Sequence, residues 1–351
     1  MYYNWKDGIN EIELNNVAQS ILNGEIVVMP TETVYGIGAD LYNEEAIKKI
    51  FIAKNRPQNN PLIVHIGRKE EIELVAEKPT RIEQALIDEF MPGPFTIILK
   101  KKKDSVPEMV SAGLDTIGVR MPSSEIANRI ILGVGHPLVL PSANVSGRPS
   151  GTRIEDIAGE LESKVYAIID GGDSQIGLES TVVKVIDNIP VILRPGKITP
   201  EDIERVVGKC NIDKNVFVNP TKVIEAEMPG SKFEHYSSKL ECNLICSEDN
   251  EKIIQKINSI INEKNGRVAV IAFDDITGKV NATQDRIFSI KRSESKEEDT
   301  KNYAEKIYTY IREAENTDSD LILIQGVKEE GLGIAIMNRL LRTSSFKTIQ
   351  V

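Results

Sequence analysis

Four short clusters of hydroxyl and basic side chains each follow a stretch of apolar, strand-forming residues. They occupy residues 31–35, 142–150, 180–181 and 194–196. One such cluster alone is typical of an ordinary turn. Four of them together offer hydroxyl groups, backbone N–H groups and guanidinium forks, which are the groups that bind phosphate oxygens. We interpret them as parts of one pocket for a phosphate-bearing ligand.

Further basic residues lie near these clusters. Lys54 and Arg56 lie in a polar loop after a predicted helix, and Arg120 ends a predicted strand. Judged alone, Arg120 fits a surface salt bridge as well as it fits a ligand contact. His65, in an apolar strand, likewise fits a buried structural histidine as well as a ligand contact. The stretch 30–62 therefore forms the predicted centre of the site: a polar turn, which a strand precedes, then a helix and a basic loop.

The usual nucleotide and metal signatures are missing from the sequence. Gly196 and Lys197 are followed by Ile198, so they form no P-loop. No Gly-x-Ser-x-Gly elbow and no His/Cys metal spacing occurs. The sequence therefore predicts a phosphate site assembled from scattered residues, without a dedicated metal site.

The elements that must position these residues alternate between strands and helices, which predicts an α/β fold. A strand at 25–29 precedes the central stretch, a helix at 44–53 lies within it, and a strand at 61–66 begins at its end. The composition changes after Gly208, so we predict a first domain at 1–208, a linker at 209–239 and a smaller α/β domain at 240–351. Within the latter, the charged stretch 293–300 is predicted to be a solvated loop before a helix at 301–314.

The bulk composition narrows the class of protein. A chain of 351 residues suits about two domains. A net charge of -10 argues against a broad nucleic-acid-binding face. Three cysteines are too few for a disulfide framework and favour a reducing compartment. With no apolar segment at the N-terminus and none of bilayer length, we expect a cytoplasmic location without membrane contact.

In order along the chain, six stretches closely resemble a YrdC-type domain. They are residues 30–36, 54–65, 118–122, 141–150, 180–182 and 194–196. The segment 229–236 (Pro-Gly-Ser-Lys-Phe-Glu-His-Tyr) and the residues after it resemble the long, two-domain form of threonylcarbamoyl-adenylate synthases. The resemblance implies a twisted mixed sheet with a concave cavity, followed by a Rossmann-like domain.

The resemblance also implies a reaction. L-threonine, bicarbonate (or CO2) and ATP would give L-threonylcarbamoyl-AMP and pyrophosphate. The product would pass to the transferase machinery that modifies adenosine-37 of tRNA. Mg²⁺ would arrive with ATP.

Site residues carry over by motif. Lys54 and Arg56 are the implied catalytic residues. The implied contacts of L-threonine are Thr33, His65, Arg120, Leu140 and Ser180. The implied contacts of ATP are Arg56, Asn60, Thr116, Ser142, Ser150, Arg194 and Tyr236, the last as part of a lid.

The linker departs from the family pattern at three positions. Ser231 replaces Met, Phe233 replaces Tyr and Ser238 replaces the closing Pro, which bears on how tightly the lid closes. Two alternatives stay open: a non-catalytic module that binds tRNA or double-stranded RNA, and carbamoyl transfer to another acceptor. The acidic net charge weighs against the first. The second occurs in hydrogenase-maturation proteins that carry zinc fingers, and no Cys-x-x-Cys pair occurs here.

Overall fold

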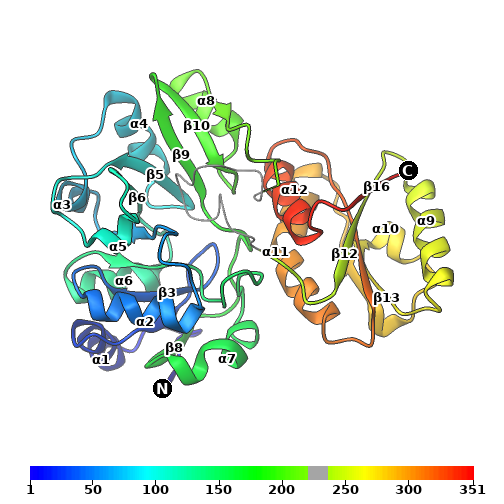
Figure 1. The fold of residues 1–351 in the computed structure, drawn as a ribbon, viewed down its shortest axis with the longest axis horizontal. Helices are drawn as coiled ribbons and strands as arrows, with labels where there is room; N and C mark the ends of the chain where they lie inside the picture. Colours follow the sequence, from blue (N-terminus) through cyan, green and yellow to red (C-terminus); the bar gives the residue numbers. More distant parts are fainter. Residues whose placement is uncertain (220–235) are drawn as a thin grey trace. The chain divides into compact units, whose positions relative to one another are not determined.

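A computed structural model describes residues 1–219 and 236–351 (Figure 1). The predictions for Ser231 and Phe233 lie outside the described residues. The chain forms two compact units. The described parts of the first are residues 1–146 and 150–219, and those of the second are 147–149 and 236–351. The predicted linker, 209–239, contains the gap between the two described ranges.

The first unit is built on a mixed sheet of eleven strands, in the order β1-β8-β2-β3-β7-β4-β6-β5-β9-β10-β11. The strands are β1 (Tyr2–Asn4), β2 (Val27–Met29), β3 (Gly36–Asp40), β4 (Ile63–His65), β5 (Phe95–Lys100), β6 (Thr116–Arg120), β7 (Leu138–Val139), β8 (Ala167–Asp170), β9 (Thr181–Ile186), β10 (Ile189–Arg194) and β11 (Asn211–Ile212). The α-helices are α1 (Glu11–Leu22), α2 (Glu44–Lys54), α3 (Ile72–Val75), α4 (Arg81–Phe90), α5 (Glu108–Ser111), α6 (Glu125–Val134), α7 (Glu155–Leu161) and α8 (Pro200–Val207).

Two apolar clusters cover the faces of this sheet. Val28 belongs to one cluster, and its neighbours Val27 and Met29 belong to the other. Since successive strand residues point to opposite faces, β2 is buried on both sides. The strand that leads into the polar turn is therefore fixed from both faces.

The polar turn joins two antiparallel strands, which the sequence did not predict. β2 pairs with β3, with Val28 opposite Ile37. The β3 sequence carries two glycines, which weaken any strand signal. Packing explains them, because a Cβ on Gly36 would lie 2.6 Å from Leu140 Cγ and one on Gly38 2.8 Å from Met29 Cε. The turn therefore lies at the C-terminal end of β2, as a hairpin connection to β3, while β2 also pairs in parallel with β8.

Capping residues decide where Lys54 and Arg56 lie. The Asn43 side chain accepts a hydrogen bond from Ala46 N at 3.0 Å and starts α2. Asn55 ends the helix in the left-handed conformation, with φ 49°. Lys54 is thus the last helical residue, and Arg56 opens the basic loop.

The second unit is a parallel five-stranded sheet, in the order β14-β13-β15-β12-β16, with helices on both faces (Figure 1). Its strands are β12 (Glu241–Cys246), β13 (Val268–Phe273), β14 (Ile287–Ile290), β15 (Leu321–Gln325) and β16 (Thr348–Gln350). Its α-helices are α9 (Asn250–Glu263), α10 (Asp274–Thr277), α11 (Lys296–Ala314) and α12 (Leu332–Thr343). The predicted α/β class, with a mixed sheet and a smaller parallel domain, is confirmed.

One boundary in the second unit was predicted wrongly. The stretch 293–300 is not wholly a loop, because α11 begins at Lys296. Ser295 caps it by accepting from Glu298 N at 3.2 Å, and acidic residues fill the first turn. Within the described ranges, no helix combines the length and apolarity needed to cross a bilayer.

The second unit also includes three residues from the middle of the chain, 147–149. Arg148 forms a bidentate ion pair with Glu315. Arg312 Nη2 donates to the Pro149 carbonyl oxygen at 2.5 Å, and Ser237 N donates to the Gly147 carbonyl oxygen at 2.7 Å. These contacts place the short segment firmly in the second unit.

Candidate active site

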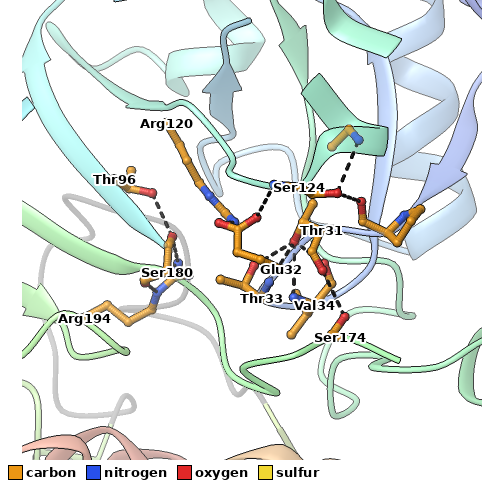
Figure 2. A network of polar contacts seen from close by, with 12 residues as sticks. Thr31, Glu32, Thr33, Val34, Thr96, Arg120, Ser124, Ser174, Ser180 and Arg194 are labelled. Atoms are coloured by element: carbon orange, nitrogen blue, oxygen red, sulfur yellow. Dashed lines mark hydrogen bonds and ion pairs between the residues drawn. The ribbon is translucent and has the colours of Figure 1, made fainter. Parts of the chain in front are cut away.

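The turn between β2 and β3 is held by its own hydroxyl groups. Thr31 Oγ1 accepts from Thr33 N at 3.2 Å and from Val34 N at 3.3 Å. It also lies 2.8 Å from Thr33 Oγ1. Ser174 Oγ donates to the Thr31 carbonyl oxygen at 3.2 Å (Figure 2). The predicted site residue Thr33 is therefore a fully buried hydroxyl in a rigid turn.

Arg120 lies beside this turn. Figure 2 shows it reaching from β6 to the carboxylate of Glu32, and Nη2 donates to Oε1 at 2.6 Å. Both side chains are buried. The surface-salt-bridge interpretation of Arg120 is therefore wrong. Glu32 was not predicted as the partner of Arg120, although it is part of the polar turn, residues 31–35 (Thr-Glu-Thr-Val-Tyr).

His65 lies directly opposite Arg120 in the parallel pair β4–β6. Its Nδ1 donates to the Ile63 carbonyl oxygen at 3.2 Å, which leaves Nε2 as an acceptor in the neutral ring. Burial, with a further contribution from Arg120, holds the pKa of His65 well below its usual range. His65 therefore stays neutral near pH 7 and offers a lone pair to a donor.

Ser180 links two more strands to the site. Its hydroxyl lies 2.8 Å from Thr96 Oγ1 and accepts from Arg194 Nη2 at 3.0 Å (Figure 2). Arg194 also donates to the Ser180 carbonyl oxygen, through Nη2 at 2.9 Å and Nε at 3.1 Å. The predicted residues Ser180 and Arg194 are thus brought together, and Thr96 joins them without having been predicted.

Positive charge accumulates around the basic loop. Burial and then Arg194 lower the pKa of Arg56, and burial and then Arg56 lower the pKa of Lys54. Arg194 thus lies close enough to Arg56, and Arg56 close enough to Lys54, to disfavour the charge of each, while Glu160 and Glu179 favour the charge of Lys54. Phosphate oxygens bound beside Arg56 would favour its charged form.

Lys54 and Arg56 also donate hydrogen bonds to backbone carbonyl oxygens of nearby loops. Lys54 Nζ donates to the carbonyl oxygens of Ser142 and Asn144, the second at 2.6 Å. Arg56 Nη2 donates to the Pro61 carbonyl oxygen at 2.8 Å. Lys54 is 1% exposed. Its ammonium group therefore links the start of the basic loop to residues 142–150, the serine-rich loop, in the protein interior.

The serine-rich loop is anchored to the hairpin. Ala143 N donates to the Tyr35 carbonyl oxygen at 2.7 Å, and Tyr35 N donates to the Gly151 carbonyl oxygen at 3.0 Å. Ser142 Oγ donates to Asn144 Oδ1 at 2.6 Å. Both ends of the loop therefore bond the backbone of Tyr35, the last residue of the polar turn.

Ser150 has a buried acidic partner. Its hydroxyl donates to Glu179 Oε1 at 2.5 Å, and both residues are buried. A hydroxyl has one proton, so Ser150 offers only its lone pairs to a further partner. Glu179 is a second partner residue that the sequence analysis missed.

The remaining predicted residues of the first unit occupy different places. Asn60 is 1% exposed, and neither polar atom of its amide has a hydrogen-bond partner among the described residues. Leaving a buried amide without hydrogen bonds costs free energy, so Asn60 is a candidate for binding a polar ligand group. Leu140 packs on the glycines of β3. Thr116 and Arg120 lie at opposite ends of β6, about 13 Å apart, on one face.

Tyr236 belongs to the second unit. Its ring stacks on Tyr308 with centroids 5.6 Å apart, and Arg339 lies 5.3 Å from its centroid. Its backbone has φ 67°, and its carbonyl oxygen accepts from Thr343 Oγ1 at 2.9 Å. These contacts of Tyr236 are all with residues of the second unit.

The described residues contain no group of three or more His, Cys, Asp or Glu side chains arranged to hold a metal ion. The two buried carboxylates of the site, Glu32 and Glu179, are bonded to Arg120 and Ser150. The donor set of the site therefore suits an anion better than a resident cation.

Stability should depend on His65 as the pH falls. Because the folded pKa is depressed, the unfolded chain binds a proton near pH 6.5 that the folded chain does not. The free energy of unfolding should therefore fall as pH drops below about 6.5, by at most about 1.4 kcal/mol per pH unit from this group. Thermal melts between pH 5 and 7.5 should show a shallower dependence for His65→Gln. Parallel curves would contradict the assignment.

Comparisons with known proteins agree along the whole chain. A family model described as "Telomere recombination" matches residues 19–196, and one described as "Threonylcarbamoyl-AMP synthase, C-terminal domain" matches residues 198–345. The chain is 38% identical to "Threonylcarbamoyl-AMP synthase" of Pyrococcus abyssi over 351 residues, covering 99% of this chain and 98% of that protein. It is 37% identical to the protein of that name in Bacillus subtilis, covering 97% and 95%.

Solved structures give the same picture. "Crystal structure of P. abyssi Sua5 complexed with L-threonine" matches with a TM-score of 0.92 at 37% identity, covering 100% of this chain and 99% of that one. "Crystal structure of E. coli YciO" matches at 25% identity with a TM-score of 0.51, covering 56% of this chain and 95% of that one.

Proposed function

The chain belongs to the threonylcarbamoyl-AMP synthase family, and from this premise we propose how its residues make L-threonylcarbamoyl-AMP from L-threonine, bicarbonate (or CO2) and ATP. The observation that carries the proposal is the gathering of cations beside buried hydroxyl groups. After burial, Arg194 lowers the pKa of Arg56 and Arg56 lowers the pKa of Lys54, and the Ser180 hydroxyl accepts a hydrogen bond from Arg194. The family resemblance of the sequence motifs is confirmed.

The chemistry requires no nucleophile from the protein. The amine of L-threonine adds CO2 to give a carbamate, and a carbamate oxygen then attacks the α-phosphorus in line. Pyrophosphate leaves, and the mixed anhydride remains. Catalysis in such a step comes from positioning and from stabilising the charge that develops on the phosphate oxygens.

We assign L-threonine to the side of the site formed by the hairpin, β4 and β6. Arg120 would bind the carboxylate, because a guanidinium fork matches two carboxylate oxygens. The acceptor Nε2 of His65 would receive the threonine hydroxyl proton, with Thr33 and Ser180 as further polar contacts. Leu140 would border the methyl group. Losing a hydrogen bond discriminates more strongly than losing a methyl contact, so these polar groups would select threonine.

We assign ATP to the basic and serine-rich loops. Arg56 and Arg194 would bind the phosphates, with Lys54 holding the loop that carries Ser142 and Ser150. Asn60 would use its unpartnered amide, and Thr116, about 13 Å from Arg120 along β6, would contact a distant part of the nucleotide. Mg²⁺ would enter bound to the phosphates of ATP, as part of that substrate.

Tyr236 would complete the ATP site as part of the lid. Tyr236→Ala should raise the dissociation constant for ATP about tenfold, since one aromatic stacking contact with a base contributes about 1–3 kcal/mol. Calorimetric titration with a non-hydrolysable ATP analogue measures this. Tyr310→Ala is the matched control, because Tyr310 contacts β14 through its hydroxyl. Unchanged ATP affinity with a lowered melting temperature would make Tyr236 a packing residue of the second unit.

The proposed reaction has a direct test. Purified protein with ATP should release pyrophosphate only when both L-threonine and bicarbonate are present. Equal release without threonine would contradict the proposal. The adenylate product should then support threonylcarbamoylation of tRNA when the downstream transferase machinery is added. We propose that this transfer takes place in the cytoplasm, with its tRNA acceptor.

Neither alternative function is favoured. An RNA-binding module and a carbamoyl transferase for another acceptor would each leave part of the chain without an explanation. Both family models, by contrast, fit one synthase over residues 19–196 and 198–345.

A further inference from the structure

A buried carboxylate holds the arginine that we assign to the threonine carboxylate. Glu32 is 8% exposed, and its Oε1 accepts from Arg120 Nη2 at 2.6 Å. Its Oε2 accepts from Ser124 N at 3.3 Å, just before α6 (Figure 2). The end of β6 and the start of α6, both distant from Glu32 in the sequence, therefore hold its carboxylate in one orientation.

Energy alone does not account for this ion pair. Burying two charges costs about as much as their attraction returns, so a buried pair is weak evidence for a role in stability. Its geometry is more informative. Arg120 Nε is buried and has no hydrogen-bond partner among the described residues. The guanidinium group thus has N–H capacity left after binding Glu32.

We propose that Glu32 is a positioning residue for L-threonine, which acts by fixing the guanidinium plane of Arg120 for the substrate carboxylate. This inference rests on the proposed function. The carbonyl oxygen of Glu32 accepts from Ile176 N at 3.0 Å, so the backbone of the turn is held as well as the side chain. Because Thr33 follows directly in the same turn, Glu32 ties two threonine-binding groups to one rigid segment.

A second buried carboxylate provides a matched comparison. Glu179 is 7% exposed and accepts from the hydroxyl of Ser150, which we assign to ATP. The two glutamates are similar in burial. Glu32 is bonded to Arg120, which we assign to L-threonine, and Glu179 is bonded to Ser150, which we assign to ATP. Neutralising one or the other should therefore affect different substrates.

The test is a steady-state comparison of Glu32→Gln and Glu179→Gln by pyrophosphate release. Glu32→Gln should raise KM for L-threonine about 10–100-fold, as expected when a hydrogen bond to a charged group is lost, and change KM for ATP less than about threefold. Glu179→Gln should show the opposite pattern. A purely structural role for Glu32 would instead affect both substrates alike.

Each outcome separates the inference from the proposed function. Equal changes in both KM values, or a lower kcat with unchanged KM for threonine, would overturn the role of Glu32. Absence of threonine-dependent release in the unmodified protein would instead overturn the proposed function. If Glu32→Gln does not melt cooperatively, Glu32→Asp replaces it. Asp keeps the charge but shortens the reach by one methylene group, so KM for threonine should again rise alone, and an unchanged value would contradict the inference.

Discussion

Arg56→Ala is expected to lower kcat/KM for ATP by about 10²–10³-fold, because it removes a preorganised cation from the phosphate site. The expected loss of stability is small by comparison. Arg56 is half-buried and donates to the carbonyl oxygens of Pro61 and Asn60, the latter at 3.3 Å. Losing these two bonds should reduce the free energy of unfolding by about 1–2 kcal/mol.

Pyrophosphate-release kinetics and thermal melts on the same preparations measure the two effects. Arg68→Ala is a suitable control, since Arg68 is an exposed arginine of the same unit. It should leave both activity and melting temperature near those of the unmodified protein. A fall in melting temperature large enough to explain the lost activity of Arg56→Ala would show that Arg56 serves the fold alone.

Lys54→Ala should have a different signature, with both activity and stability strongly reduced. Lys54 is 1% exposed and bonds the carbonyl oxygens of Ser142 and Asn144. Alanine would leave the buried Asn144 carbonyl oxygen without this donor, at a cost of about 1–3 kcal/mol, and would also remove the bond to the half-buried Ser142 carbonyl oxygen. Since the freed loop carries Ser142 and leads to Ser150, ATP binding should weaken as well. Denaturant unfolding and ATP titration should therefore both change.

Lys49→Ala is the matched control for this effect. Lys49 is another lysine of α2, half-exposed, and it bonds the carbonyl oxygen of Gly24 at 2.8 Å. Its loss should cost less than about 1 kcal/mol and leave ATP binding unchanged. A Lys54→Ala protein with full stability but no turnover would mean that its ammonium group acts on substrate and not on the loop.

The sequence predicted the position of most elements because their signals are local. Capping residues and apolar periodicity gave α2 nearly to the residue, and the strands predicted at 25–29 and 61–66 contain β2 and β4. The strand β3 was not predicted, because it depends on tertiary packing. Its glycines are needed for the close approach of Leu140 and Met29. The start of α11 escaped because its charged first turn is typical of solvated loops as well as of helix N-termini.

The same division applies to the site. Arg56, Ser180 and Arg194 were proposed from the sequence because they lie in the stretches that resemble a YrdC-type domain. Glu32 and Glu179 were not predicted. A carboxylate repels an anionic ligand, so a role in an anion site becomes apparent only when its cationic or hydroxyl partner is known. Only the structure pairs each with its partner, 88 and 29 residues away.

Residues 147–149 belong to the second unit although they lie within the sequence of the first, so the two units cannot be separated by a single cut in the chain. A stop codon placed near residue 236 would not yield an intact first unit, since it would also remove Glu315 and Arg312, which bind Arg148 and Pro149. The serine-rich loop would lose its anchors at its tip. Expressing the halves separately therefore tests an altered protein, and a genuine single-unit version would need a redesigned loop between Ser146 and Ser150.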